Sequence, residues 1–171
     1  CLQNTNALSA KPGALFLTRQ KTETLMRDKD FDSSIISKGG YTVSGGSEDY
    51  PDLVLVSTGS EGGAVQAAKK ALEGHDVSVR HVSIPCLERF QEQPEEYQWT
   101  VLPPSSIIVV VEAGVTGPWM QFADDVIGLD RYGASAPIKV LQQQFGFTSE
   151  KLYEELVIIL QENGILAVEE E

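Results

Sequence analysis

The fold class of this chain is decided by Leu53-Val54-Leu55-Val56, followed at once by Thr58-Gly59-Ser60-Glu61. A continuous apolar run of this length predicts a strand that is covered on both faces, as in a parallel sheet. Thr58 and Glu61 have the spacing of a capping box, which predicts that a helix starts directly after the strand. A buried strand that leads into a helix is the repeating unit of α/β proteins.

Strands and helices continue to alternate on both sides of this unit. Apolar residues at helical spacing follow Gly63, and Gly74 can end that helix. We expect the other strands at Tyr41–Val43, Val77–Ile84, Ile107–Val111 and Val126–Leu129. We expect the other helices at residues 87–100 with a break at Pro94, at Pro118–Asp125, at Pro137–Gln144 and in an amphipathic segment capped by Thr148. This order predicts an α/β domain of three layers, α/β/α, around a mostly parallel sheet of about five strands.

The N-terminal part of the chain has a different pattern. Ala14-Leu15-Phe16-Leu17 predicts a short buried strand that ends in Thr18-Arg19-Gln20. Residues 21–37 are charged and only weakly periodic, which is typical of a surface linker. The sequence therefore predicts a domain boundary within this stretch. At the other end, Glu169-Glu170-Glu171 predicts a solvated acidic tail.

Composition argues against several classes of function. The 171 residues include 13 Lys and Arg against 25 Asp and Glu, so the net charge is −12 at pH 7. Nucleic-acid binding needs a positive surface, and no nucleic-acid partner is expected. The longest apolar run, Ile107–Val111, is too short to span a bilayer, and the first residues lack the pattern of a signal peptide, so no membrane partner is expected either. Cys1 and Cys86 form no CxxC pair, which fits a reducing compartment, and Cys86 is expected to be a small buried hydrophobic residue.

Arg19 is the candidate binding residue of this chain. It would project from the carboxyl end of a buried strand, where the ligands of open α/β sheets gather. A guanidinium at such a place can hold a phosphate through two parallel hydrogen bonds. From position alone, a surface or interface arginine is the alternative.

Other polar residues also follow strand ends. The turn Gly59–Gly63 looks like a phosphate cradle, but it lacks the glycine patterns of nucleotide sites and Glu61 would repel a phosphate, so a tight strand-to-helix turn is favoured. Glu112 could act as an acid or base, yet no polar partner is visible and a capping or interface role is favoured. His75 and His81 lack zinc-binding spacing, so no metal site is predicted in this chain.

Taken in order, these motifs resemble the C-terminal third of the transketolase family. The resemblance covers the chain from about Ala14 to Leu160, nearly its whole length. It is carried by Leu17-Thr18-Arg19-Gln20, Lys38-Gly39-Gly40-Tyr41, Val56-Ser57-Thr58-Gly59-Ser60-Glu61, Val82-Ser83-Ile84-Pro85-Cys86, Val111-Glu112-Ala113-Gly114, Gly128-Leu129-Asp130-Arg131-Tyr132-Gly133-Ala134-Ser135-Ala136-Pro137 and Phe145-Gly146-Phe147-Thr148.

The resemblance implies a domain organisation. Residues 1–38 would be the tail of the middle, pyrimidine-binding domain and a linker, residues 39–165 the C-terminal domain, and residues 166–171 the acidic tail. It also implies that the parent protein is an enzyme of the pentose phosphate pathway. Such an enzyme moves a two-carbon ketol unit from a ketose phosphate to an aldose phosphate with thiamine diphosphate and Mg²⁺ or Ca²⁺, as a homodimer.

The family's cofactor and catalytic residues lie upstream of this stretch. The resemblance therefore implies that this chain holds no catalytic, cofactor-binding or metal-binding residue and is inactive alone. Arg19 matches the family arginine that contacts the substrate phosphate, so that role falls on Arg19. The expected location of the parent is the cytoplasm, with a plastid as the alternative.

Two other readings remain open from the sequence. Dihydroxyacetone synthase, which uses formaldehyde as acceptor, shares much of this pattern, and its distinguishing acceptor pocket would lie upstream. The chain could also be a stand-alone interaction or regulatory module whose Gly59–Gly63 turn binds an anionic ligand. One local departure from the family is Gly62, which replaces an apolar residue and weakens the predicted start of the helix.

Overall fold

A five-stranded sheet forms the centre of the protein, of which the computed structural model describes residues 14–45 and 49–168. The strands are β1 (Tyr41–Ser44), β2 (Leu53–Ser57), β3 (Val79–Ser83), β4 (Ile107–Val111) and β5 (Asp125–Ile127). Their order in the sheet is β1-β3-β2-β4-β5. The strands β2 to β5 pair in parallel, and β1 pairs antiparallel to β3 at one edge. The prediction of a mostly parallel sheet is confirmed.

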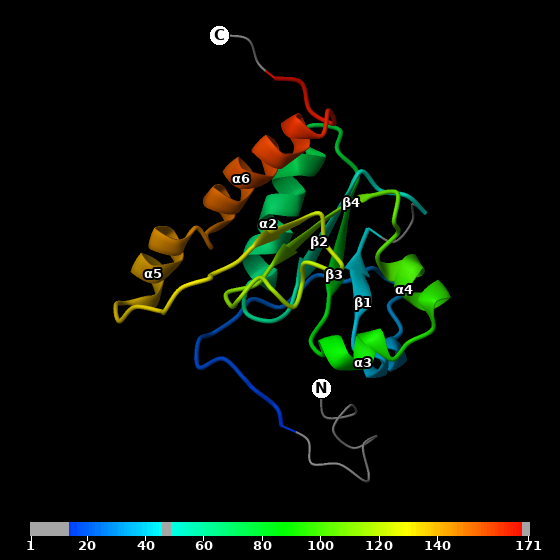
Figure 1. Cartoon of the computed structure of the whole chain (residues 1–171), viewed down its shortest axis with the longest axis horizontal. Helices are drawn as coiled ribbons and strands as arrows, with labels where there is room; N and C mark the ends of the chain where they lie inside the picture. Colours follow the sequence, from blue (N-terminus) through cyan, green and yellow to red (C-terminus); the bar gives the residue numbers. More distant parts are fainter. Residues whose placement is uncertain (1–13, 46–48, 169–171) are drawn as a thin grey trace.

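Helices cover both faces of the sheet (Figure 1). One face carries α2 (Gly62–Glu73) and α6 (Ser149–Glu162), and the other carries α3 (Leu87–Gln91) and α4 (Glu95–Val101). A 3₁₀ helix, η1 (Ser33–Lys38), precedes β1, and α5 (Ile138–Phe145) precedes α6. The three-layer α/β/α prediction is therefore confirmed. No helix in the described ranges is long and apolar enough to cross a membrane.

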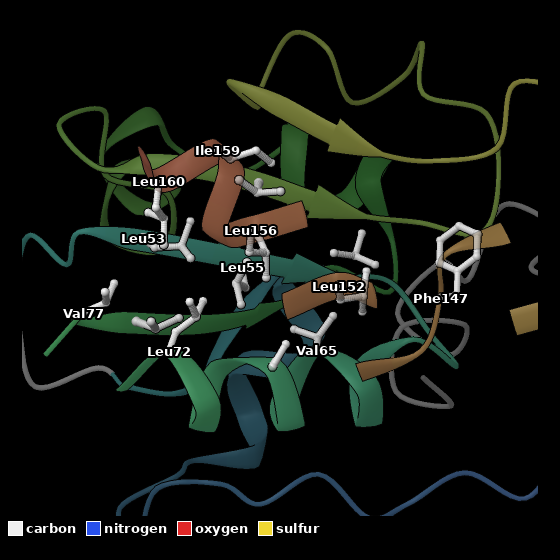
Figure 2. Packing of buried hydrophobic residues seen from close by; sticks show 14 residues of the cluster. Leu53, Leu55, Val65, Leu72, Val77, Phe147, Leu152, Leu156, Ile159 and Leu160 are labelled. Atoms are coloured by element: carbon white, nitrogen blue, oxygen red, sulfur yellow. The ribbon is translucent and has the colours of Figure 1, made fainter. Parts of the chain in front are cut away.

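The central strand β2 divides its side chains between two apolar clusters. Leu53 and Leu55 pack with α2 and α6 on one face, as Figure 2 shows. Val54 and Val56 pack with α3 and α4 on the other face. All residues of β2 are buried, and each aliphatic side chain removed from water in this way stabilises the fold by about 2 kcal/mol. The continuous apolar run thus behaves as the sequence predicts.

The helix boundaries follow local signals closely. Thr148 caps α6, since its hydroxyl oxygen accepts a hydrogen bond from the Lys151 amide at 3.3 Å. Gly74 ends α2, and Pro137 precedes α5 as its N-cap residue. Pro94 separates α3 from α4, as predicted.

One strand prediction is wrong. Residues 14–17 form no strand, and the side chains of Leu15, Phe16 and Leu17 are exposed, with Phe16 at 92%. A strand needs a hydrogen-bonded neighbour, and nothing in residues 14–45 or 49–168 pairs with this stretch. An apolar run indicates a possible strand, but it does not show which other strand, if any, is available to pair with it.

The helix predicted at Pro118–Asp125 is also wrong. The segment forms turns, in which the Trp119 amide donates to Thr116 and the Phe122 amide donates to Trp119. Asp124 then ends the segment, because its amide donates to the Ile108 carbonyl at 2.9 Å and its carboxylate accepts from the Ile108 amide at 2.8 Å. These two bonds to β4 draw the chain into β5 before a helix can form.

A substitution on α6 tests this packing. The side chain of Leu156 is buried between α6 and the sheet and only 1% exposed, whereas Ile158 on the same helix is 52% exposed. Leu156→Ala should lower the free energy of unfolding of the chain by about 3 kcal/mol because it leaves a cavity in the core. Ile158→Ala should cost less than about 1 kcal/mol. Urea unfolding followed by circular dichroism measures both, and equal losses would contradict the assignment of the buried face.

Candidate functional site

A hollow of about 470 Å³ lies where the carboxyl ends of the strands converge. Its walls come from the loops after β2, β4 and β5, from α2 and α5, and from residues 18 and 20–23 of the N-terminal segment. Lining residues include Thr18, Gln20, Ser60, Glu61, Ala113 and Phe145. Open α/β sheets bind ligands at this edge, and the volume is within the range of small-molecule sites.

The structure places Arg19 beside this hollow but not in its wall. Thr18 and Gln20 on either side line the hollow, whereas the Arg19 side chain is exposed. The Gln20 amide donates to the Thr18 hydroxyl at 3.1 Å, which shapes the backbone at this point. Because residues 14–17 form no strand, the expectation that Arg19 projects from a strand end is wrong. Its role in phosphate binding stays a prediction.

Glu112 has a partner that sequence reasoning missed. Thr58 follows β2 and Glu112 follows β4, and the Thr58 hydroxyl donates a hydrogen bond to the Glu112 carboxylate. Burial raises the pKa of Glu112, the Thr58 hydrogen bond opposes this rise, and the negative charge of Glu61 adds to it. Since Ser57 pairs with Val111 in the sheet, the next residue of each strand meets its counterpart. Only the strand order reveals this pairing.

The predicted capping box does not form, because Glu112 is the hydrogen-bond partner of Thr58. The Thr58 hydroxyl bonds to Glu112, and α2 begins at Gly62 with Glu61 as an N-cap residue that makes no side-chain capping bond. The Ser60 hydroxyl donates to the Glu61 carboxylate at 2.7 Å. Two carboxyl groups, Glu61 and Glu112, therefore stand at the turn Gly59–Gly63, and the negative charge of Glu61 opposes an anionic ligand there.

The two histidines lie in different environments. His81 of β3 is 0% exposed, and its Nε2 is 2.9 Å from the Ser57 hydroxyl on β2. Burial, joined by the positive charge of Lys69 on α2, lowers the pKa of His81 from 6.5 to about 4. His75 is exposed and bonds to the Tyr153 hydroxyl at 3.0 Å. Sequence reasoning identified neither hydrogen bond.

Few groups in the described ranges could hold a metal. No three His, Cys, Asp or Glu residues there come together in a metal-binding arrangement. Cys86 is half-buried, so the expectation of a buried cysteine holds only in part, and its thiol is 3.9 Å from the Glu88 carboxylate. The side chains of the hollow and its rim can position a ligand by hydrogen bonds and apolar contact.

The segment of residues 23–28 runs along α2 next to the hollow. The Met26 amide donates to the Gln66 side-chain oxygen at 3.0 Å, and the Gln66 side-chain nitrogen donates to the Met26 carbonyl at 2.8 Å. The side chains of Leu25 and Glu23 lie over Gly62 and Gly63 at the start of the helix. Sequence reasoning treated this stretch as a linker and missed these contacts, because it offers no periodic pattern.

Comparison with known proteins defines the class of this domain. Residues 39–148 match the family model of the transketolase-like TK C-terminal domain. Fold and match together define an α/β domain of the transketolase C-terminal type. The chain belongs to the transketolase family.

Individual relatives agree with this assignment. Transketolase from Aquifex aeolicus is 39% identical over 150 residues, which cover 85% of this chain and 22% of that protein. Transketolase from Mycobacterium tuberculosis H37Rv is 42% identical over 147 residues, which cover 81% and 21%. The chain therefore spans about a fifth of the length of the curated relatives it matches.

Solved structures share the fold. Transketolase from Leishmania mexicana superposes with a TM-score of 0.71 at 36% identity, over 80% of this chain and 20% of that one. Pichia stipitis transketolase, solved in complex with sedoheptulose 7-phosphate, superposes with a TM-score of 0.69 at 34% identity, over 76% and 19%.

The buried histidine makes stability depend on pH. His81 is neutral in the folded chain down to about pH 4, whereas in the unfolded chain it takes up a proton below pH 6.5. The contribution of His81 to the free energy of unfolding should therefore be constant above pH 6.5. As the pH drops toward 4, this contribution should lower the free energy of unfolding by about 3 kcal/mol. His81→Gln should remove that part of the slope, and His75→Gln should leave it unchanged. Urea midpoints measured from pH 7.5 to 4 test this, and a wild-type slope in His81→Gln would contradict it.

Proposed function

We propose that this chain is the C-terminal part of a transketolase whose parent transfers a two-carbon ketol unit from a ketose phosphate to an aldose phosphate. The observation that carries the proposal is the match of residues 39–148 to the transketolase C-terminal domain model. Relatives named transketolase extend this likeness over more than four fifths of the chain. A cytoplasmic parent follows as the expectation for such an enzyme.

The chemistry is proposed to reside in parts of the parent outside this chain. The chain spans about a fifth of its relatives, and its described residues do not fit thiamine diphosphate or its metal. Glu61 places negative charge at the turn where a diphosphate would meet a helix N-terminus, and the described residues bring together no metal-binding set. We therefore assign no catalytic, cofactor-binding or metal-binding residue to this chain, and expect it to be inactive alone.

Arg19 is proposed to contact the phosphate of the sugar substrate. Its side chain is exposed, and its two neighbours Thr18 and Gln20 line the hollow at the carboxyl edge of the sheet, so Arg19 can meet a ligand held by another domain. Relatives from Pichia stipitis were solved with fructose 6-phosphate and sedoheptulose 7-phosphate, which are substrates of the proposed class.

The surface around α5 supports a structural contribution to the parent, including its proposed homodimer. No residue of α5 is buried, and Tyr132 in the preceding loop is 97% exposed. Val140 on α5 is exposed as well. Ile138 exposes an apolar side chain on the same helix, and exposed apolar surface of this kind marks sites that other protein segments cover.

An assay of the intact parent tests the proposed reaction. With thiamine diphosphate and Mg²⁺, xylulose 5-phosphate and ribose 5-phosphate should yield sedoheptulose 7-phosphate, detected by mass spectrometry. The isolated 171-residue chain should yield none under the same conditions. If the parent forms no sedoheptulose 7-phosphate, the proposed transketolase activity is refuted. If formaldehyde is the preferred acceptor, the parent is a dihydroxyacetone synthase instead.

A substitution in the parent tests the role of Arg19. Arg19→Ala should raise the KM for xylulose 5-phosphate about tenfold, because a charge-assisted contact to the phosphate is lost. Lys29→Ala removes the same charge from an exposed position in the same stretch and should leave the KM within about twofold. Steady-state kinetics measures both, and an unchanged KM in Arg19→Ala would remove this residue from the site.

A further inference from the structure

Residues 23–28, which we call the strap, lie against the first half of α2. The strap is part of the blue N-terminal segment in Figure 1. Its central contact is the pairing of the Gln66 side-chain amide with both backbone groups of Met26, at 3.0 and 2.8 Å. A primary amide offers one acceptor and two donors, so it can pair with a peptide unit much as a neighbouring strand would. One side chain of the helix thereby fixes the backbone of the strap.

Two glycines allow the strap to approach the helix closely. A Cβ at Gly62 would lie 3.0 Å from a methyl carbon of Leu25, and one at Gly63 would lie 3.6 Å from the Cβ of Glu23. The absence of a side chain at Gly62 therefore makes room for Leu25, which fills that place over the buried start of α2.

The chain is also held at two residues that follow Met26. The Asp28 amide donates to the Val43 carbonyl on β1 at 3.3 Å, and the ring of Phe31 packs against that of Tyr41 with centroids 5.6 Å apart. Helix α2 and strand β1 therefore hold the strap at separate points. Upstream of Met26, residues 18 and 20–23 line the hollow.

The clamp at Met26 limits where Arg19 can go. Arg19 lies seven residues upstream of Met26, so its backbone stays within roughly 25 Å of the clamp even when fully extended. Release of Met26 would leave the Asp28 amide as the next backbone hydrogen bond that ties this segment to the sheet, which enlarges the volume that Arg19 explores. Precise placement of a binding group lowers the entropic cost of substrate binding, and small displacements weaken it.

We propose that Gln66 is a positioning residue that clamps the strap to α2 and thereby holds Arg19 in place for the substrate phosphate. The inference rests on the proposed function, because it presumes that Arg19 contacts that phosphate. Gln66 itself touches no substrate. It acts through the backbone of Met26, and its effect on binding is expected only for substrates that carry a phosphate.

Hydrogen exchange in the intact parent tests the clamp without reference to activity. Gln66→Ala removes both hydrogen bonds to Met26 and should speed exchange in a peptide covering residues 22–30 about tenfold, while peptides from β2 and β4 keep their rates. Gln91→Ala, at an exposed position on α3 on the other face of the sheet, serves as the control and should change neither. Unchanged exchange of the strap in Gln66→Ala would overturn the inference.

Kinetics with matched substrates tests the consequence for binding. Gln66→Ala should raise the KM for xylulose 5-phosphate several-fold with kcat within about twofold, and leave kcat/KM for unphosphorylated xylulose unchanged. Added to Arg19→Ala, it should have no further effect, because the residue that it positions is gone.

The possible failures are distinguishable. If exchange rises but the KM for xylulose 5-phosphate stays at the wild-type value while Arg19→Ala raises it, the inference is overturned and the proposed function stands. If Arg19→Ala itself leaves the KM unchanged, both the proposed phosphate contact and its positioning by Gln66 are refuted. Equal losses with xylulose and xylulose 5-phosphate would also overturn the inference, because they indicate a general loss of structure.

Discussion

Complete burial of β2 is the constraint on which the rest of the structure depends. The strand pairs with β3 on one side and β4 on the other, and its side chains alternate between an α2–α6 layer and an α3–α4 layer. Every backbone group in such a strand needs a hydrogen bond within the sheet, and every side chain needs an apolar neighbour. These demands place two strands and two helical layers around one short segment. They also bring the residues that follow β2 and β4 to the same edge.

That edge carries polar groups whose chemistry depends on their neighbours. Thr58 and Glu112 extend the register of β2 and β4 by one residue, and their hydrogen bond joins two loops that are far apart in sequence. The partly buried carboxyl of Glu112 and the charge of Glu61 make the edge unfavourable for anions. In the proposed transketolase parent, we propose that Arg19 on the N-terminal segment, and not the Gly59–Gly63 turn, contacts the phosphate of the substrate. The N-terminal segment would contribute to substrate binding, and the sheet would contribute to the stability of the domain.

Local signals predicted most of the regular structure, and they failed where a distant partner decides. The apolar runs of β2 and β4, the cap at Thr148 and the break at Pro94 all act within a few residues, so the sequence shows them directly. Residues 14–17 look like a strand, yet nothing in the described parts of the chain pairs with them. Pro118–Asp125 looks like a helix, yet Asp124 bonds to Ile108 across the sheet and ends the segment. Thr58 and Glu61 have the spacing of a cap, yet Glu112 takes the hydroxyl.

The sequence by itself determined the class of fold, the family and the choice of Arg19 as the residue to test. These depend on the order of elements and on motifs that are contiguous in the chain. Only the tertiary structure decided that Glu112 meets Thr58, that His81 meets Ser57 between sheet and helix, and that Gln66 holds the backbone of Met26. Each of these contacts joins residues at least 24 positions apart. Their formation depends on which strands become neighbours and on which face of α2 is left open, and no local pattern encodes either.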